Sequence, residues 1–275
     1  MQQLAIAALV VVMMLAIGLR TEPHEFRVVF ERPWLLVATV LVNVVLIPLG
    51  VWGLVTVASL PDEVAVGLML CAVSPGGATG PLFATQARGH VALSVASMIL
   101  LAMISVVSAP PTLALAFGGM SEVGSGALLL PMMGTLALFQ LLPLVAGMAL
   151  RRWFVVFADR VAGPANRVAT ALLLLIVAGL LVLKGDSLLE LSALSLSVCV
   201  GVVLLSLGAG ALVSRDGAMR RSLSLVTAVR NLSLALLLSA SFYPAALTDA
   251  TVLSFGLFCM VIPLAVSLAW RSRPS

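Results

Sequence analysis

The feature of this sequence that most constrains its fold is a run of helix-breaking residues inside a long apolar segment, residues 63–87. The run at its centre is Ala72-Val73-Ser74-Pro75-Gly76-Gly77-Ala78-Thr79-Gly80-Pro81. The whole segment is long enough to cross the ~30 Å hydrocarbon layer as a helix, but prolines and glycines interrupt helices. A break about 18 Å into the span cannot face lipid, so it is expected to line a protein-walled or watery cavity. Such discontinuous helices indicate a transporter's binding site; a kinked helix without function is the alternative.

The overall composition places the chain in a membrane. Of its 275 residues, 62% are hydrophobic and 9% are charged, whereas soluble domains contain about 45–50% apolar residues. Segment lengths predict an all-α polytopic membrane protein with nine transmembrane helices. The expected spans are 2–19, 33–57, 63–87, 90–117, 124–149, 164–184, 188–214, 218–242 and 245–270. The first is expected to be a retained span rather than a signal peptide, and the longest connections, near 20–32 and 150–163, are too short to fold alone.

Basic residues gather on one predicted side of the membrane. Of the 15 Lys and Arg residues, all but Lys184 and Arg230 lie on that side: Arg20, Arg27, Arg32, Arg88, Arg151, Arg152, Arg160, Arg167, Arg215, Arg220, Arg221, Arg271 and Arg273. Because positive residues remain on the cytoplasmic side, we expect the N-terminus outside and the C-terminus in the cytoplasm of a cell with an inner (cytoplasmic) membrane. This distribution also argues against a nucleic-acid partner, because the charges sit in short loops between apolar spans.

A second interruption makes an inverted repeat visible in the sequence. The eighth expected span contains Thr227-Ala228-Val229-Arg230-Asn231-Leu232-Ser233 near its centre, as the third contains its own break. Spans 1–4 and 6–9 then form two sets of opposite topology, and span five is an extra. In transporters with this layout the site lies where the two interrupted helices meet. We therefore expect residues 75–81 and 230–233 to lie within reach of each other.

Arg230 is the most informative side chain, because it lies about 18 Å into its span at helical rise. An arginine at the membrane centre costs at least ~2.5–3.5 kcal/mol on insertion scales and needs a partner. The eleven acidic residues all lie in loops or at span ends. Carbonyls at the ends of half-helices, amides such as Asn43 and Asn231, water or an anionic ligand remain. A structural arginine pinned to carbonyls and an arginine that binds substrate both remain open.

Polar and backbone-exposing residues around the two breaks are the candidate substrate-binding residues. They are Asn43, Ser74, Gly76, Gly77, Thr79, Gly80, Pro81, Ser94, Thr227, Arg230, Asn231 and Ser233. For any one of the hydroxyls, a hydrogen bond to its own helix is the alternative explanation. No catalytic set of His, Asp and Ser lies at membrane depth, and the three cysteines have no metal or redox spacing. We therefore expect neither an enzyme nor a cofactor or metal.

Several motifs resemble the bile acid:sodium symporter family. They are Ser74-Pro75-Gly76-Gly77, then Ala87-Arg88-Gly89-His90-Val91-Ala92-Leu93-Ser94, and Arg230-Asn231 followed by Leu234-Ala235, which is similar to the family's Gln-Asn…Leu-Ala crossover. The resemblance covers the whole chain, beginning at the family's second helix. It implies a panel domain, here residues 1–32 and 118–187, and a core domain, here residues 33–117 and 188–275. It also implies two unwound core helices that cross beside the substrate cavity.

The sodium-site positions depart from the family's pattern. By the resemblance, those positions are Asn43, Gly80, Pro81, Ser94, Met98, Val226 and Arg230. The family's glutamate corresponds to Val226 and a glutamine to Arg230, which lies four residues later and is expected on the same helix face. Hard cations prefer oxygen ligands, and a guanidinium at about 4 Å would repel a cation by about 4 kcal/mol at an effective dielectric of 20. That corresponds to roughly a thousandfold loss of affinity, so Arg230 is expected to act as a tethered cation, with transport as a uniporter, an exchanger or with protons. The alternative is that Arg230 extends away through a polar cavity and that a site of backbone carbonyls still holds sodium.

The leading interpretation is therefore a secondary transporter that moves a small organic anion across the lipid bilayer by alternating access. The alternative is a non-transporting membrane receptor or sensor that retains the transporter fold. The sequence specifies neither the substrate nor the coupling ion.

Overall fold

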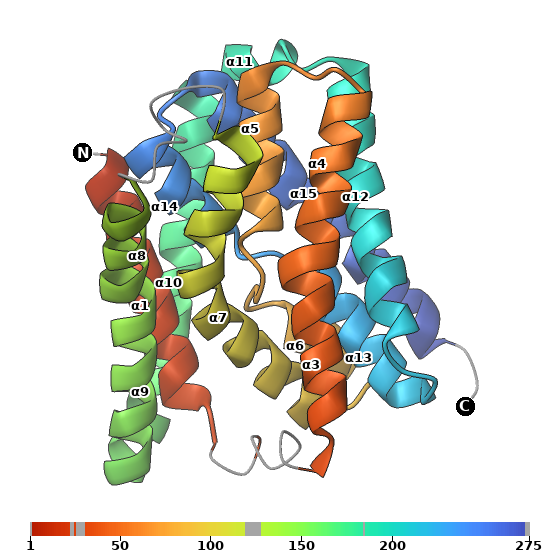
Figure 1. Ribbon diagram of the computed structural model, residues 1–275. Helices are drawn as coiled ribbons and strands as arrows, with labels where there is room; N and C mark the ends of the chain where they lie inside the picture. Colours follow the sequence, from red (N-terminus) through yellow and green to blue (C-terminus); the bar gives the residue numbers. More distant parts are fainter. Residues whose placement is uncertain (1, 23–24, 26–30, 119–127, 184, 273–275) are drawn as a thin grey trace.

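The computed structural model describes residues 2–22, 25, 31–118, 128–183 and 185–272. Within these ranges the chain is helical, and its elements are easily followed in Figure 1. They are α1 (Gln2–Arg20), α3 (Pro33–Leu41), the π-helix η2 (Val42–Leu46), α4 (Ile47–Val57), α5 (Asp62–Ala72), α6 (Gly80–Gln86), α7 (Val91–Phe117), α8 (Leu129–Leu136), the π-helix η5 (Ala137–Leu141), α9 (Leu142–Trp153), α10 (Val155–Leu183), α11 (Gly185–Leu189), α12 (Ala193–Leu212), α13 (Gly217–Ala228), α14 (Leu232–Phe242) and α15 (Ala246–Arg271).

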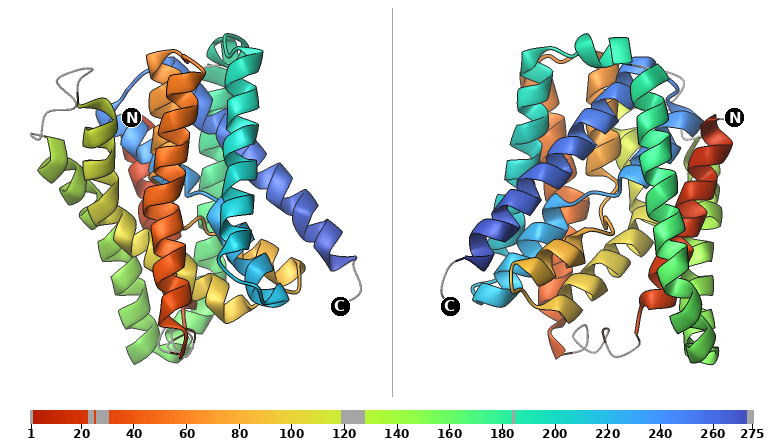
Figure 2. Two further views of the ribbon diagram at one scale, coloured as in Figure 1. Left: turned by 45° about the vertical axis from the view of Figure 1, so that its right-hand side comes forward. Right: turned by 180° about the vertical axis from the view of Figure 1, so that it is seen from behind.

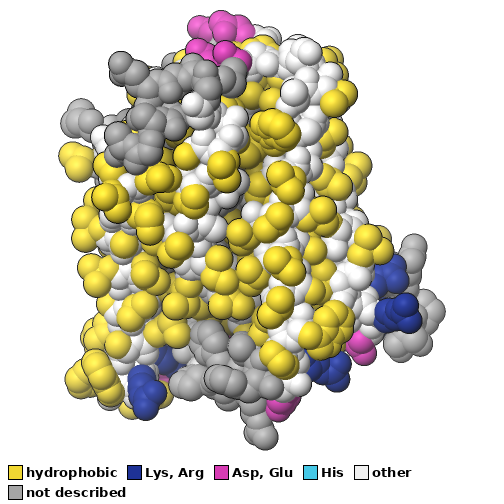
Figure 3. Space-filling model, in the orientation of Figure 1, with side chains coloured by type: hydrophobic (Ala, Val, Ile, Leu, Met, Phe, Trp, Pro, Cys, Tyr) yellow, Lys and Arg dark blue, Asp and Glu magenta, His cyan; other side chains and the backbone are white. Residues whose placement is uncertain are grey.

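Seven uninterrupted stretches of the described residues are long and apolar enough to cross a membrane. They are Gln2–Arg20, Pro33–Val57, Val91–Phe117, Leu129–Trp153, Val155–Leu183, Ala193–Leu212 and Ala246–Arg271. Their apolar side chains cover the middle of the molecular surface in Figure 3, whereas Lys and Arg side chains appear near its lower end. The chain is a multi-pass membrane protein, as the composition predicts.

The two expected interruptions are both present. Residues 73–79 separate α5 from α6, and residues 229–231 separate α13 from α14. In Figure 1, α5 and α14 occupy the upper half of the molecule, and α6 and α13 occupy the lower half. Each break therefore leaves the C-terminus of one half-helix and the N-terminus of the next near the middle of the structure.

Each of the two π-helical segments lies just before a proline. A proline ring clashes with the carbonyl of the residue four positions earlier, and for Pro48 and Pro143 those carbonyls belong to Val44 and Phe139, inside η2 and η5. A π-turn relieves such a clash by widening the helix locally. Both spans therefore remain continuous.

The expected loop at 150–163 is wrong. Helix α9 ends at Trp153, and α10 begins at Val155, nine residues before the expected start of its span. The early turns of α10 are stabilised by packing, since Ala158 and Ala162 are buried in a cluster with Leu19 of α1. The expected start of the fifth span, near residue 124, lies outside the described residues.

The helices form two packed groups, one of α1, α9 and α10 and one of the helices next to the breaks. Helix α1 packs mainly against α9 and α10, α5 packs against α15, and α12 packs against α13. Figure 2 shows α1, α9 and α10 side by side, with α15 running obliquely across the other helices. A cluster of buried residues extends from α1 through α5, α7, α12 and α14 to α15.

Candidate functional site

The two breaks contact each other through their backbones. Pro75 and Arg230 form an isolated antiparallel β-bridge. On either side of it, the Asn231 N–H donates to the Ser74 carbonyl at 2.8 Å, and the Gly77 N–H donates to the Val229 carbonyl at 3.3 Å. Peptide groups that leave a helix at this depth thus find partners in the opposite break. The expected crossing is confirmed.

Glycines allow this close approach. Gly76 has a φ of +86°, a conformation that L side chains rarely adopt. A Cβ on Gly76 would also lie 2.6 Å from the Met98 carbonyl oxygen, and a Cβ on Gly77 would lie 2.5 Å from the Arg230 carbonyl oxygen. Both distances are shorter than real Cβ contacts. The glycine pair is therefore required by the crossing itself.

Arg230 lies in the crossing with its guanidinium only partly satisfied. The residue is 3% exposed, and its Nη1 donates to the Ala72 carbonyl at the C-terminus of α5, at 3.3 Å. A cation at a helix C-terminus complements the negative end of the helix dipole. Among the described residues, Nε and Nη2 find no hydrogen-bond partner. A helix-end carbonyl, one of the partners that the sequence left open, is therefore present, but it satisfies only part of the guanidinium.

The space beside Arg230 is small in this conformation. A void of about 10 Å³ for water-sized spheres lies between the crossing and α15, and its lining includes Arg230, Asn231, Phe255 and Met260. That volume is about what one water molecule needs. The Nδ2 of Asn231 is also buried without a partner among the described atoms. The crossing thus holds unused donors around a space that is too small for an organic solute.

Asn43 reaches the second broken span from outside the crossing. Its Nδ2 donates to the Thr39 carbonyl at 2.8 Å and to the Thr227 hydroxyl at 3.1 Å. Both Asn43 and Thr227 are fully buried, and the Asn43 Oδ1 is unpartnered within the described part of the chain. The amide expected from the sequence therefore contacts α13 rather than Arg230.

The other candidate hydroxyls point in different directions. Ser74 donates to the Leu70 carbonyl of the preceding helix α5 at 2.7 Å, and Ser94 donates to the Val91 carbonyl of its own helix α7 at 2.6 Å. Thr79 faces Met260 of α15, and Ser233 faces Met13 of α1 while also donating to the Asn231 side chain. The structure thus brings the backbones of the two breaks into contact. It does not bring the candidate hydroxyl groups together around one point.

The expected face shared by Val226 and Arg230 is wrong. Helix α13 ends at Ala228, and Val229 is extended with φ −84° and ψ 111°. The one-turn spacing of a continuous helix therefore does not apply. Val226 lies instead against Gly80, whose Cβ would be 3.3 Å from the Val226 Cα and 3.5 Å from its Cγ2. Apolar atoms fill this contact between α6 and α13.

Two buried polar side chains, Cys259 and Gln140, were not among the residues that the sequence indicated. Cys259 of α15 accepts the Arg230 backbone N–H through Sγ at 3.1 Å and donates to the Ala228 carbonyl at 3.2 Å. Nothing in the cysteine spacing indicates this. Gln140 of η5 is fully buried; its Nε2 donates to the Ala102 carbonyl and to the Ser105 hydroxyl. A lone glutamine within an apolar span was a usable signal, since buried polar groups in membranes need partners.

Interrupted helices that meet near the middle of their spans are typical of secondary transporters, whose solute-binding sites lie at such crossings. Comparison with known proteins agrees: the family model described as "Sodium Bile acid symporter family" matches residues 7–191, more than half of the chain. The chain belongs to this family of membrane transporters. A curated relative is the "Uncharacterized sodium-dependent transporter YocS" of Bacillus subtilis (strain 168), 27% identical over 143 residues. The match covers 52% of this chain and 43% of that protein, less than half of its length.

Proposed function

We propose that this protein is a secondary transporter that carries a small organic anion through the crossing of the two broken spans by alternating access. Nine spans result when α5–α6 and α13–α14 each count as one crossing beside the seven long stretches. The proposal treats the four spans before α8–η5–α9 and the four spans after it as an inverted repeat, with α8–η5–α9 as the extra span. It assigns the α1, α9 and α10 group to a panel and the helices around the breaks to a core, which agrees with their packing.

The proposed orientation follows the basic residues, with the N-terminus outside and the C-terminus in the cytoplasm of an inner membrane. The view in Figure 3 supports it, because its visible Lys and Arg side chains lie toward the end where α1 finishes at Arg20.

The observation that carries the substrate class is the buried guanidinium of Arg230. It keeps Nε and Nη2 unpartnered among the described residues, and an unpaired buried donor on a cation is costly. A carboxylate or sulfonate accepts such donors in charge-assisted hydrogen bonds. The void beside Arg230 holds about one water, so solute entry requires the surrounding helices to move apart. An anion is therefore favoured over a cation or a neutral solute.

The same geometry supports transport without sodium. The contact between Gly80 and Val226 is filled by apolar atoms, which supply no ligand to a hard cation. Arg230 adds a fixed positive charge at the crossing. The guanidinium reaches the Ala72 carbonyl of α5 rather than sharing a helix face with Val226. Its repulsion of a cation beside Val226 is therefore weaker than at 4 Å, because the Coulomb energy falls inversely with distance.

The test is uptake into reconstituted vesicles. A thermal-shift screen with organic carboxylates and sulfonates, each beside its matching amide, selects the probe, since a ligand of the folded state raises apparent stability. Uptake of that probe is then measured with sodium replaced by potassium or choline at constant potential and pH. We expect uptake to persist without sodium and to fall in Arg230→Gln. Loss of uptake without sodium, or full activity of Arg230→Gln, refutes the tethered-cation proposal.

The uptake assay also distinguishes a transporter from the alternative class of protein, a receptor or sensor. A receptor or sensor with this fold would show anion-induced stabilisation without net uptake or exchange of the same anion. A preference for cationic solutes would overturn the substrate class.

A further inference from the structure

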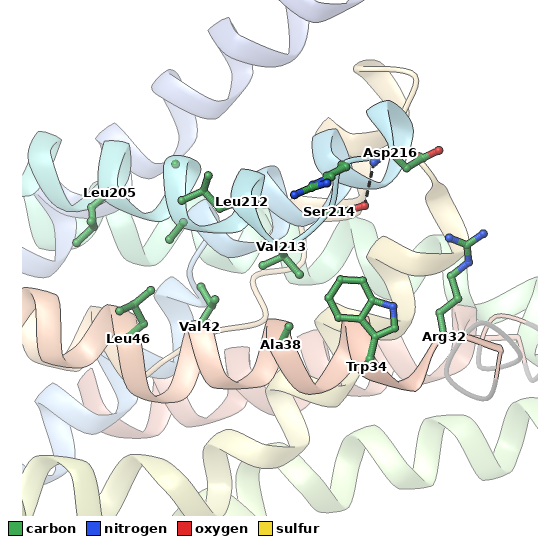
Figure 4. Close-up of a pocket in the computed structure, with 13 residues that line it drawn as sticks. Arg32, Trp34, Ala38, Val42, Leu46, Leu205, Leu212, Val213, Ser214 and Asp216 are labelled. Carbon is green, nitrogen blue, oxygen red and sulfur yellow. Dashed lines mark hydrogen bonds between the residues drawn. The ribbon is translucent and has the colours of Figure 1, made fainter.

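A groove on the outside of the molecule is separate from the crossing. Its volume is about 970 Å³, and it runs between the span α3–η2–α4 and helix α12. Figure 4 shows Leu46 and Leu205 toward one end of the groove and Arg32, Trp34 and Asp216 toward the other. None of its lining residues belongs to either break. Val42 lines the groove, whereas the next residue, Asn43, bonds to Thr227 on the inner side.

The groove walls have the spacing of an acyl-chain track. Ala38, Val42 and Leu46 recur every four residues and therefore lie on one face of their helical span. Opposite them, Leu205 and Leu212 are separated by two helical turns. Eight residues of helix extend about 12 Å along the helix axis, which suits a hydrocarbon chain that runs parallel to the helices.

One end of this groove is polar and basic. Arg32 and Arg215 both line it and are exposed. Arg32 donates from Nη1 to the Met219 thioether at 3.5 Å, a weak acceptor, and its other donors have no partner within the described part of the chain. Arg215 makes no hydrogen bond or ion pair with another described residue. Trp34, 62% exposed, adds an aromatic ring of the kind that gathers at membrane interfaces.

The acidic residues near this end do not cancel the two arginines. Asp216 caps α13, with its Oδ1 accepting the Met219 N–H at 2.9 Å, so its charge faces the positive end of a helix. Glu31, the neighbour of Arg32, is exposed and already has an interaction. Basic pockets between transmembrane helices on the cytoplasmic side bind anionic lipid headgroups.

We propose that the groove binds one anionic phospholipid from the leaflet at the arginine-rich end. Its phosphate lies between Arg32 and Arg215, beside Trp34, and one acyl chain follows the apolar track toward Leu46 and Leu205. Charge complementarity and the direction of the track favour a lipid over a soluble anion, because a soluble anion has no acyl chain to cover the apolar side chains of the groove. This inference does not depend on the proposed transport activity.

The experiment measures lipid binding to the full-length protein by native mass spectrometry in detergent. The probes are phosphatidylglycerol and phosphatidylcholine with identical acyl chains. We expect tighter binding of phosphatidylglycerol and a loss of about thirtyfold in the double variant Arg32→Gln/Arg215→Gln. That fold-change corresponds to about 2 kcal/mol, or about 1 kcal/mol for each interfacial arginine. The matched control is Arg220→Gln/Arg271→Gln, which removes two exposed arginines outside the groove and is expected to retain phosphatidylglycerol binding.

A second pair of variants tests the apolar track. Gly208 lines the groove, and a Cβ there meets no described heavy atom within 4 Å. Gly208→Phe is therefore expected to fill the track without disturbing the helix packing and to weaken binding of both lipids. Gly201, two turns earlier on α12, has the same free space but does not line the groove. Gly201→Phe is expected to bind as the wild type does.

Three outcomes overturn the proposal. Equal binding of phosphatidylglycerol and phosphatidylcholine would show that the two arginines do not select an anionic headgroup. Binding of inorganic phosphate as tight as that of phosphatidylglycerol, measured in the same way, shows an anion site without a lipid track. A dimer that is lost in Gly208→Phe, together with no measurable lipid binding, shows that a second copy covers the groove.

Discussion

Replacing Arg230 with methionine separates a structural arginine from one that serves a ligand. The substitution removes the hydrogen bond from Nη1 to the Ala72 carbonyl, and a bond to a charged group contributes about 1.5–3 kcal/mol. It also removes a cation from the membrane centre, where its placement costs about 2.5–3.5 kcal/mol. The difference lies between about zero and about 2 kcal/mol in favour of the variant. Methionine is a flexible apolar side chain and adapts to the space that remains.

The assay is thermal unfolding of both proteins in the same detergent, with and without the best organic anion. At about 2–4 °C per kcal/mol for a chain of this size, we expect the midpoint of Arg230→Met to be unchanged or up to about 8 °C higher. We also expect the anion to stabilise the wild type alone. If the fold itself needs the guanidinium, its removal leaves the Ala72 carbonyl buried without a donor at a cost of about 1–3 kcal/mol, and the midpoint falls by about 2 °C or more. That fall would refute the reasoning. Arg220→Met, at an exposed position, is the control.

Two further predictions concern the crossing. Gly77→Ala places a Cβ 2.5 Å from the Arg230 carbonyl oxygen and is expected to lower stability by about 2 kcal/mol or more, because it strains the bridge and its backbone hydrogen bonds. In the same thermal assay Gly201→Ala, with free space for its Cβ, is expected to be neutral or stabilising; equal effects would contradict the crossing. In a double-mutant cycle, Asn43→Ala and Thr227→Val are expected to couple by about 0.5–1.5 kcal/mol through their shared hydrogen bond, and additive effects would show that the bond contributes nothing.

The position of the first break followed from the sequence, because glycine and proline act on the backbone locally. The second break, residues 229–231, contains neither residue, and it was expected from the composition around Arg230 and Asn231. Proline alone was not sufficient for this inference. Pro110 and Pro111 lie inside α7 and Pro263 lies inside α15, and both helices continue through them. The first break differs in its glycines, of which Gly76 adopts a positive φ. The membrane class, most spans and the depth of Arg230 likewise depend on local composition and length, which the sequence states directly.

Only the tertiary structure decided what each break contacts. The bond between Arg230 and the Ala72 carbonyl joins residues 158 positions apart, and the end of α13 at Ala228 turned Arg230 away from the face of Val226. Hydropathy does not encode such pairings, because protein-facing and lipid-facing positions in a membrane helix are both apolar. For the same reason the early start of α10 against α1 and the groove beside α12 were invisible in the sequence. They depend on how neighbouring helices pack, which is a property of their three-dimensional arrangement.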